Sequence, residues 1–128
     1  MKGFVANIER DTLSNSNFRK VLYSSFHSQL VLMSLLPNEE IGMEVHPDND
    51  QFFRFEKGKG KVIIDGHEYK VTDGTAVIVP SGSQHNVINT SKTKQLKLYT
   101  VYSPPNHPDG TIHKTKAEAE EAEKHEHH

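Results

Sequence analysis

The chain has 128 residues, about the length of one domain, and its formal net charge of −2 at pH 7 comes from the acidic segment 114–128. The neutral remainder has no basic surface for nucleic acid, and no apolar run approaches the roughly 20 residues that cross a membrane, so we expect neither partner. The absence of cysteine excludes disulfides and thiolate ligands, and the absence of an apolar leader predicts a cytoplasmic protein.

Nine short segments rich in β-branched and aromatic residues, separated by turn residues, predict an all-β chain. The turn Asp65-Gly66 is a strong signal for a two-residue hairpin. Because no helix is expected between these segments, the pattern favours an antiparallel barrel or a two-sheet sandwich. In chain order, the predicted strands cover residues 18–24, 28–36, 41–46, 51–57, 60–64, 67–72, 75–79, 84–89 and 95–102.

The last segment departs from this pattern. Thr115 and Glu118 have the spacing of a helix capping box, and the sequence after them is rich in Ala and Glu. We therefore predict one β-barrel domain over residues 1–113 and a charged, helical or disordered tail over 114–128, which we interpret as a solvated appendage without chemistry. The tail contains three histidines that could bind stray metal ions: His125, His127 and His128.

A group of polar side chains predicts the chemistry of the barrel. Glu44 and His46 lie two residues apart on the predicted strand 41–46, so they point to the same face. The turn that follows would return the chain and place Gln51 beside His46. Together with His85, these residues offer the oxygen and imidazole ligands that a divalent transition metal needs. From spacing alone, the alternative to a metal site is a polar patch on an exposed strand face.

The same residues carry a resemblance to a known family. Residues 74–89 resemble the second motif of the cupin superfamily at every fixed position, and residues 38–58 resemble the first motif in spacing. Three identities of the first motif differ: Asn38 stands where the family has Gly, Glu44 where it has His, and Gln51 where it has Glu. The positions that match the second motif are Gly74, Pro80, Gly82, His85 and Asn89.

Over nearly its full length the chain also resembles the small single-domain bacterial cupins of type 2 that are labelled mannose-6-phosphate isomerase-like. The resemblance implies an antiparallel double-stranded β-helix, which is a jelly-roll barrel, here with a short C-terminal helix. It also implies a homodimer and one divalent transition metal, Zn, Fe, Mn, Ni or Cu, inside the barrel. The ligand positions that it implies are Glu44, His46, Gln51 and His85.

The function implied is that of a metal-binding cupin acting on a small polar metabolite, such as a sugar or sugar phosphate, in an isomerase-like reaction. A non-haem dioxygenase and a non-catalytic binder of small molecules or metal are the alternatives, because the fold hosts many chemistries. The proton would be moved by Glu44, or by His107 or His113 from the loop 104–113. That loop is either a lid over the barrel mouth or a surface connection stiffened by proline.

A competing metal site uses His46, Asp48 and His85 as a triad of two histidines and one carboxylate. Pro47 and the polar residues after it predict a turn that would carry Asp48 away from the strand face, which argues against this triad. Either Tyr99 or Tyr102 could face a ligand, since they lie on opposite faces of the last strand. Three cationic residues could contact an anion: Arg19, Arg54 and Lys97. One apolar row could join a dimer interface or pack inside the barrel wall: Ile41, Met43 and Val45.

Overall fold

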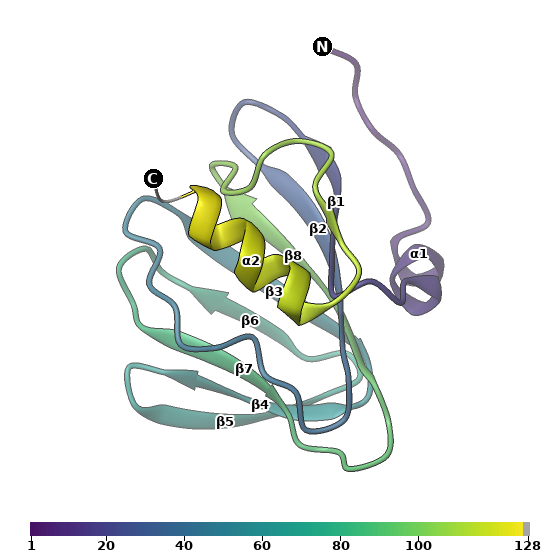
Figure 1. Ribbon diagram of the computed structural model, residues 1–128, viewed down its shortest axis with the longest axis vertical. Coiled ribbons are helices and arrows are strands. Elements are labelled where there is room, and N and C mark those ends of the chain that lie inside the picture. Colours follow the sequence, from purple (N-terminus) through teal and green to yellow (C-terminus); the bar gives the residue numbers. More distant parts are fainter. Residues whose placement is uncertain (127–128) are drawn as a thin grey trace.

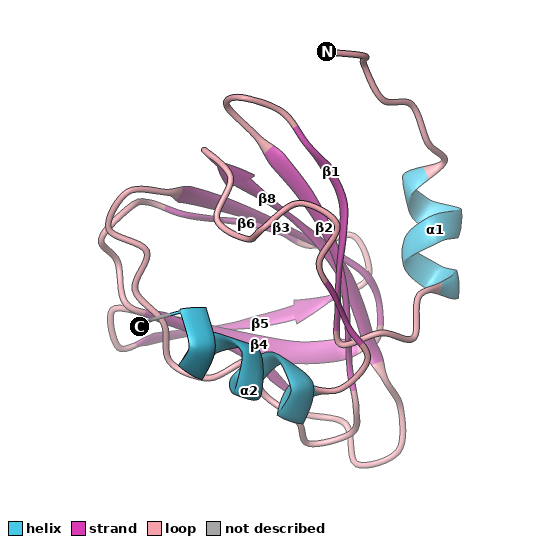
Figure 2. Ribbon diagram, turned by 45° about the horizontal axis from the view of Figure 1, so that its top comes forward, coloured by secondary structure: helices cyan, strands magenta, loops and turns pink. Residues whose placement is uncertain are grey.

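The computed structural model describes residues 1–126 of the chain, and the side chains through Lys124. Two antiparallel sheets face each other and enclose one core, as the predicted jelly-roll barrel requires (Figures 1 and 2). The larger sheet has the strand order β6-β3-β8-β2-β1-β9, and the smaller has the order β5-β4-β7. The strands are β1 (Arg19–Ser24), β2 (Gln29–Leu35), β3 (Asp50–Lys57), β4 (Lys59–Ile64), β5 (His67–Thr72), β6 (Ala76–Val79), β7 (His85–Asn89), β8 (Leu96–Ser103) and β9 (Ile112–His113).

The predicted strand 41–46 is wrong as a regular strand, whereas the other eight predicted strands are present with ends within one residue. The segment runs antiparallel to β7 through two isolated bridges, Glu40 to Ile88 and Glu44 to His85. Gly42 interrupts the ladder between them because its φ of 108° is in the left-handed region, and its N–H donates to the side chain of Asn86. This stretch therefore covers β7 as an irregular segment.

The interruption at Gly42 also changes which side chains face the core. Ile41 packs against the core, whereas Met43 and Val45 are 51% and 49% exposed. The three residues therefore do not share one face, because the change in backbone direction lies between the first and the second. The homodimer stays a prediction.

Two helices lie on opposite sides of the larger sheet (Figure 2). Helix α1 (Ile8–Ser14), which the sequence analysis did not predict, begins at Asn7, whose side chain accepts a hydrogen bond from the Arg10 backbone. Helix α2 (Lys116–Glu126) begins with the predicted cap, in which the Glu118 N–H donates to Thr115. No helix among residues 1–126 combines the length and the hydrophobicity of a membrane span.

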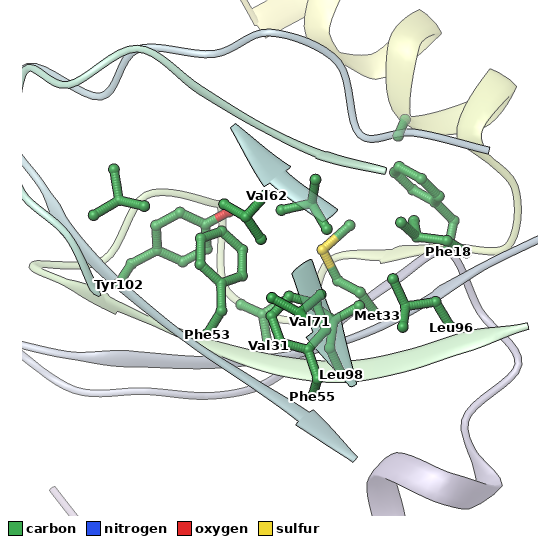
Figure 3. Packing of buried hydrophobic residues seen from close by; sticks show 14 of the residues in the cluster. Phe18, Val31, Met33, Phe53, Phe55, Val62, Val71, Leu96, Leu98 and Tyr102 are labelled. Atoms are coloured by element: carbon green, nitrogen blue, oxygen red, sulfur yellow. The ribbon is translucent and has the colours of Figure 1, made fainter. Parts of the chain in front are cut away.

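Helix α2 packs against the barrel, so the interpretation of the tail as a solvated appendage is wrong. Ala119 is 2% exposed and belongs to the same core cluster as Phe18 of the barrel. Figure 3 shows Phe18 at the end of the cluster next to this helix. Of the three tail histidines, His127 and His128 lie outside the described residues, as does the side chain of His125.

The inner face of β3 and β8 changes from apolar to polar along the strands. Phe55 pairs with Leu98 at the apolar end, and Gln51 pairs with Tyr102 at the other end. All four side chains are buried, and each buried aromatic or leucine contributes about 2 kcal/mol of hydrophobic stabilisation. The barrel therefore has an apolar end that stabilises the fold and a polar end where buried groups need partners.

Candidate metal centre

Three side chains meet at the polar end of the barrel with geometry suited to a metal ion. Glu44, His46 and His85 each offer one ligand atom, and these three atoms lie within 4.8 Å of one another. The imidazole rings of His46 and His85 are 5.3 Å apart between centroids, although 39 residues separate them in the chain. The structure thus brings together the two halves of the predicted site.

His85 presents a free lone pair to this centre. Its Nδ1 lies 3.1 Å from the carbonyl oxygen of Ser83, which can only accept, so Nδ1 carries the ring hydrogen. Nε2 is then unprotonated, and burial favours this state because it lowers the pKa of His85. A neutral imidazole with an unprotonated nitrogen is the form that binds metals.

Gln51 presents an oxygen to the same point. Its amide nitrogen donates to the hydroxyl of Thr100 at 3.0 Å, which turns Oε1 toward Nε2 of His85, 3.1 Å away. Two atoms with lone pairs thus face each other without a hydrogen between them. A separation near 3 Å is typical of neighbouring ligand atoms around one ion. With the amide in this orientation, the pair offers two lone pairs to one point.

Glu44 and His46 form the other side of the centre. Oε2 of Glu44 lies 2.9 Å from Nε2 of His46, and their side chains are 21% and 15% exposed. The backbone of Glu44 exchanges two hydrogen bonds with His85, at 2.8 and 2.9 Å, which fixes the irregular segment beside β7. Two imidazoles, one carboxylate and one amide oxygen therefore converge, and this set fits a divalent transition metal.

Tyr102 and His107 extend the polar end beyond these ligands. The Tyr102 ring lies edge-on to His46 with centroids 5.6 Å apart, and its hydroxyl lies 3.3 Å from Nε2 of His107. Burial raises the pKa of Tyr102 and lowers that of His107 to about 3, with the positive charges of Arg19 and His46 adding to the second shift. At neutral pH the pair is an uncharged phenol beside an uncharged imidazole.

Comparison with known proteins identifies the family. Residues 31–102, more than half of the chain, match the Cupin domain family. The chain belongs to the cupin family. A crystal structure of BH2720 from Bacillus halodurans is similar to this cupin with a TM-score of 0.91 and 44% sequence identity, covering 94% of this chain and 95% of the other.

Two curated proteins are also similar to this cupin. The uncharacterized protein YrkC of Bacillus subtilis (strain 168) is 49% identical over an alignment of 128 positions that covers 95% of this chain and 68% of YrkC. The uncharacterized protein L612 of Acanthamoeba polyphaga mimivirus is 46% identical over an alignment of 112 positions that covers 85% of this chain and 70% of L612. The relatives support the fold and the family, while the chemistry depends on the side chains described above.

The three departures from the first cupin motif have a structural basis in this chain. Asn38 has a φ of 63°, a left-handed conformation that asparagine adopts more readily than other non-glycine residues. Glu44 and Gln51 place their oxygens toward His46 and His85, respectively. The substitutions therefore preserve the backbone turn and the convergence of ligand atoms, and they change only the ligand types.

The loop after β8 is held over the polar end of the cupin barrel. The buried Gln29 donates to the carbonyl of His107 at 2.7 Å and accepts from the backbone N–H of Asn106 and of His107. The buried Asn49 donates to the carbonyl of Pro104. These bonds explain how His107 reaches Tyr102, whereas His113 lies on β9, opposite Arg19 of β1.

The structure distinguishes the remaining residues that the sequence offered for this site. Asp48 lies in an exposed turn and Glu44 occupies the centre, so the triad built on Asp48 is wrong. Tyr102 faces the site, while Tyr99 packs against Phe52 on the other face of the sheet. His27 and His67 are both exposed and take no part in this centre.

Sequence analysis missed the residues that position the site, namely Gln29, Asn49 and Thr100. Gln29 and Thr100 were detectable in principle, because each is a polar residue on an inward row of otherwise apolar strand positions. Asn49 precedes β3 in an irregular segment, where no periodicity shows which way a side chain points. Its contact with the loop after β8 joins residues 55 positions apart.

Proposed function

We propose that this cupin holds one divalent transition metal at Glu44, His46, Gln51 and His85 and acts on a small polar metabolite. The observation that carries this proposal is the convergence of Glu44, His46 and His85, whose ligand atoms lie within 4.8 Å of one another. When bound, the metal would supply positive charge that polarises a carbonyl or hydroxyl oxygen. Zinc, iron, manganese, nickel and copper all accept this ligand set.

We further propose that the reaction is a proton transfer beside a carbonyl group, as in an aldose–ketose isomerisation. The protonated Tyr102 hydroxyl can donate to a substrate oxygen, and the neutral His107 beside it can accept a proton. A pKa of about 3 makes His107 a weak base in the ligand-free chain. A negative charge bound nearby raises the pKa of an imidazole and so strengthens it as a base. Glu44 and His113 are the other proton-transfer candidates.

Metal titration tests the first part of the proposal. Co²⁺ is titrated into the full chain carrying H125N, H127N and H128N, so that the tail histidines cannot bind metal. One bound equivalent is expected, with d–d absorption bands that report mixed nitrogen and oxygen ligation. The variant Glu44→Gln is expected to bind more weakly because it removes the one carboxylate of the site. Equal affinity in both proteins would count against this centre.

Deuterium incorporation tests the second part. Metal-loaded protein is incubated without oxygen in D₂O with aldoses and their phosphates, and the carbon next to the carbonyl is followed by NMR. Exchange by the unsubstituted protein, and its loss in His107→Gln, supports the proton transfer. Tight binding of a metabolite without exchange supports a non-catalytic binding protein.

One observation favours a dioxygenase as the second candidate. Glu44, His46 and His85 form a set of two histidines and one carboxylate, the ligand type of non-haem Fe(II) oxygenases. Oxygen uptake by Fe²⁺-loaded protein, measured with a panel of polyols and diketones, would support this class. Activity under strict anaerobiosis would exclude it for the reaction observed.

A further inference from the structure

Arg19 is a buried cation with two nitrogens that make no hydrogen bond to the described residues, and its guanidinium lies 5.4 Å from the centroid of the Phe18 ring. It lies on β1, is 2% exposed, and is the largest of the fully buried side chains among the described residues. Its Nε and Nη1 atoms have no hydrogen-bond partner in this part of the chain. Burying an ionised group without hydrogen bonds is costly, so such a group indicates a functional role or a missing ligand.

The one described ion-pair partner of Arg19 satisfies it poorly. Oε1 of Glu123 lies 3.9 Å from Nη1, which is beyond hydrogen-bonding distance, and the Glu123 side chain is 44% exposed. A guanidinium normally binds a carboxylate through two parallel hydrogen bonds shorter than about 3 Å. Glu123 therefore supplies charge near Arg19 but leaves its N–H groups available.

The charge of Arg19 reaches Tyr102 and His107, although β1 carries Arg19 in register with Met33 of β2 and so with Leu98 of β8. Its positive charge lowers the pKa of Tyr102 and of His107, and His46 also lowers the pKa of His107. Arg19 therefore lies within electrostatic range of the two residues beside the metal centre.

The other two cationic candidates are used elsewhere. Arg54 is 40% exposed and pairs with Glu56 at 3.3 Å, and the Lys97 ammonium donates to the carbonyl of Asn15. Within the described part of the chain, Nε of Arg54 also lacks a hydrogen-bond partner, but of the three residues only Arg19 is buried as a whole side chain and has two such nitrogens. Helix α2 explains why a carboxylate is nearby: Ala119 anchors the helix in the core, and Glu123, four residues later, lies on the same helix face.

We propose that Arg19 is the anion-binding residue of this barrel and takes the carboxylate or phosphate group of the metabolite, with that oxyanion displacing Glu123. The planar guanidinium matches two oxygens of either group. This inference rests on the proposed function and narrows its substrate class to acidic metabolites. The competing explanation is that Arg19 and Glu123 only fasten α2 to the barrel.

The two explanations differ in the effect of removing the Glu123 charge. If Glu123 occupies an anion site, Glu123→Gln removes a competitor and should tighten anion binding about threefold, the effect of one partly exposed charge. If the pair only fastens the helix, Glu123→Gln lowers stability and leaves anion affinity unchanged. Because loss of Arg19 can unfold the chain, Glu123→Gln decides between them.

The experiment measures binding of inorganic phosphate and of acetate to the metal-free full chain by calorimetry. We expect Arg19→Met to weaken binding about tenfold or more and Arg19→Lys to weaken it less, because lysine keeps the charge without the two-pronged geometry. Arg54→Met is the matched control and should bind as the unsubstituted protein does. Tighter binding of phosphate or of acetate identifies which oxyanion the site prefers.

Unchanged affinity in Glu123→Gln, or no binding of either anion to that variant, overturns the assignment of Arg19. A separate Co²⁺ titration without added anion keeps this result distinct from the proposed function. Anion binding that responds to Glu123→Gln in a chain that does not bind Co²⁺ supports Arg19 and rejects the metal centre. Co²⁺ binding together with an anion affinity that Glu123→Gln leaves unchanged supports the metal centre and rejects the assignment of Arg19.

Discussion

The four candidate ligands form a buried pair and a partly exposed pair. Gln51 and His85 are 2% and 3% exposed, stand on the regular strands β3 and β7, and each has a hydrogen bond that fixes its orientation. Glu44 and His46 are more exposed and stand on the irregular segment before β3, where they contact each other. The comparison shows that half of this site is built into the sheets, while the other half depends on contacts that hold a loop-like segment in place.

The largest expected effects come from removing one histidine from each pair. His85→Ala and His46→Ala should each weaken Co²⁺ binding by about 100-fold or more, since each removes a ligand. Only His85→Ala should lower the free energy of unfolding of the metal-free chain substantially, by about 2 kcal/mol, because it leaves a buried cavity. Chelator competition and urea denaturation measure the two quantities.

Both variants are best made in the full chain with H125N, H127N and H128N. Shortening the chain before Lys114 would remove the tail histidines but would also remove Ala119, a core residue. If His46→Ala destabilises the metal-free chain as much as His85→Ala does, the distinction between the buried pair and the partly exposed pair is incorrect.

A smaller effect is expected from the residue that orients Gln51. Thr100→Val keeps the side-chain shape but removes the hydroxyl that accepts from the Gln51 amide, so the amide is free to turn its oxygen away from His85. Metal affinity should fall about tenfold, as is typical when a hydrogen bond behind a ligand is lost. The exposed Thr93→Val is the matched control, and an equal Co²⁺ affinity for both variants would show that Gln51 is not a ligand.

The partly exposed pair has its own support in Asn86. This buried residue of β7 accepts from the Gly42 backbone and donates to Glu40, at 2.9 and 3.2 Å, and so fastens the segment that carries Glu44. Asn86→Ala should lower the free energy of unfolding by about 1 kcal/mol and weaken metal binding about threefold. The exposed Asn106→Ala should change neither quantity. A metal affinity unaffected by Asn86→Ala would mean that the bridges to β7 alone position the pair.

The same division explains how far the sequence could predict this structure. Alternation of apolar and polar residues placed eight strands, because each of these strands has one face in a common core. Alternation failed at residues 41–46, since Gly42 and the side chain of Asn86 together replace the strand ladder there. Glu44 and His46 nevertheless meet as predicted, because the bridge to β7 restores strand geometry at Glu44.

Residues that act across long sequence distances were harder to predict. Gln29 holds His107 over the site from 78 positions away, and Arg19 meets Glu123 only because α2 docks against the barrel. The alternating apolar and acidic composition of α2 gives little evidence of docking, because a single small residue, Ala119, makes the buried contact. Such contacts depend on tertiary packing, which spacing along one chain does not encode.

The smallest predicted effect extends the comparison to another imidazole, that of the half-buried His107. Its pKa is lowered from 6.5 to about 3 in the folded chain, so the unfolded chain binds the proton more tightly. His107 therefore contributes stability above about pH 6.5, and this contribution is lost as the pH falls toward about 3. When the pH is lowered from about 7 to about 5, the free energy of unfolding of His107→Gln should fall by about 1 kcal/mol less than that of the unsubstituted chain, with allowance for the partial exposure of His107. Urea denaturation of the metal-free proteins measures this difference, and parallel losses in both would show that His107 is accessible to protons in the folded state.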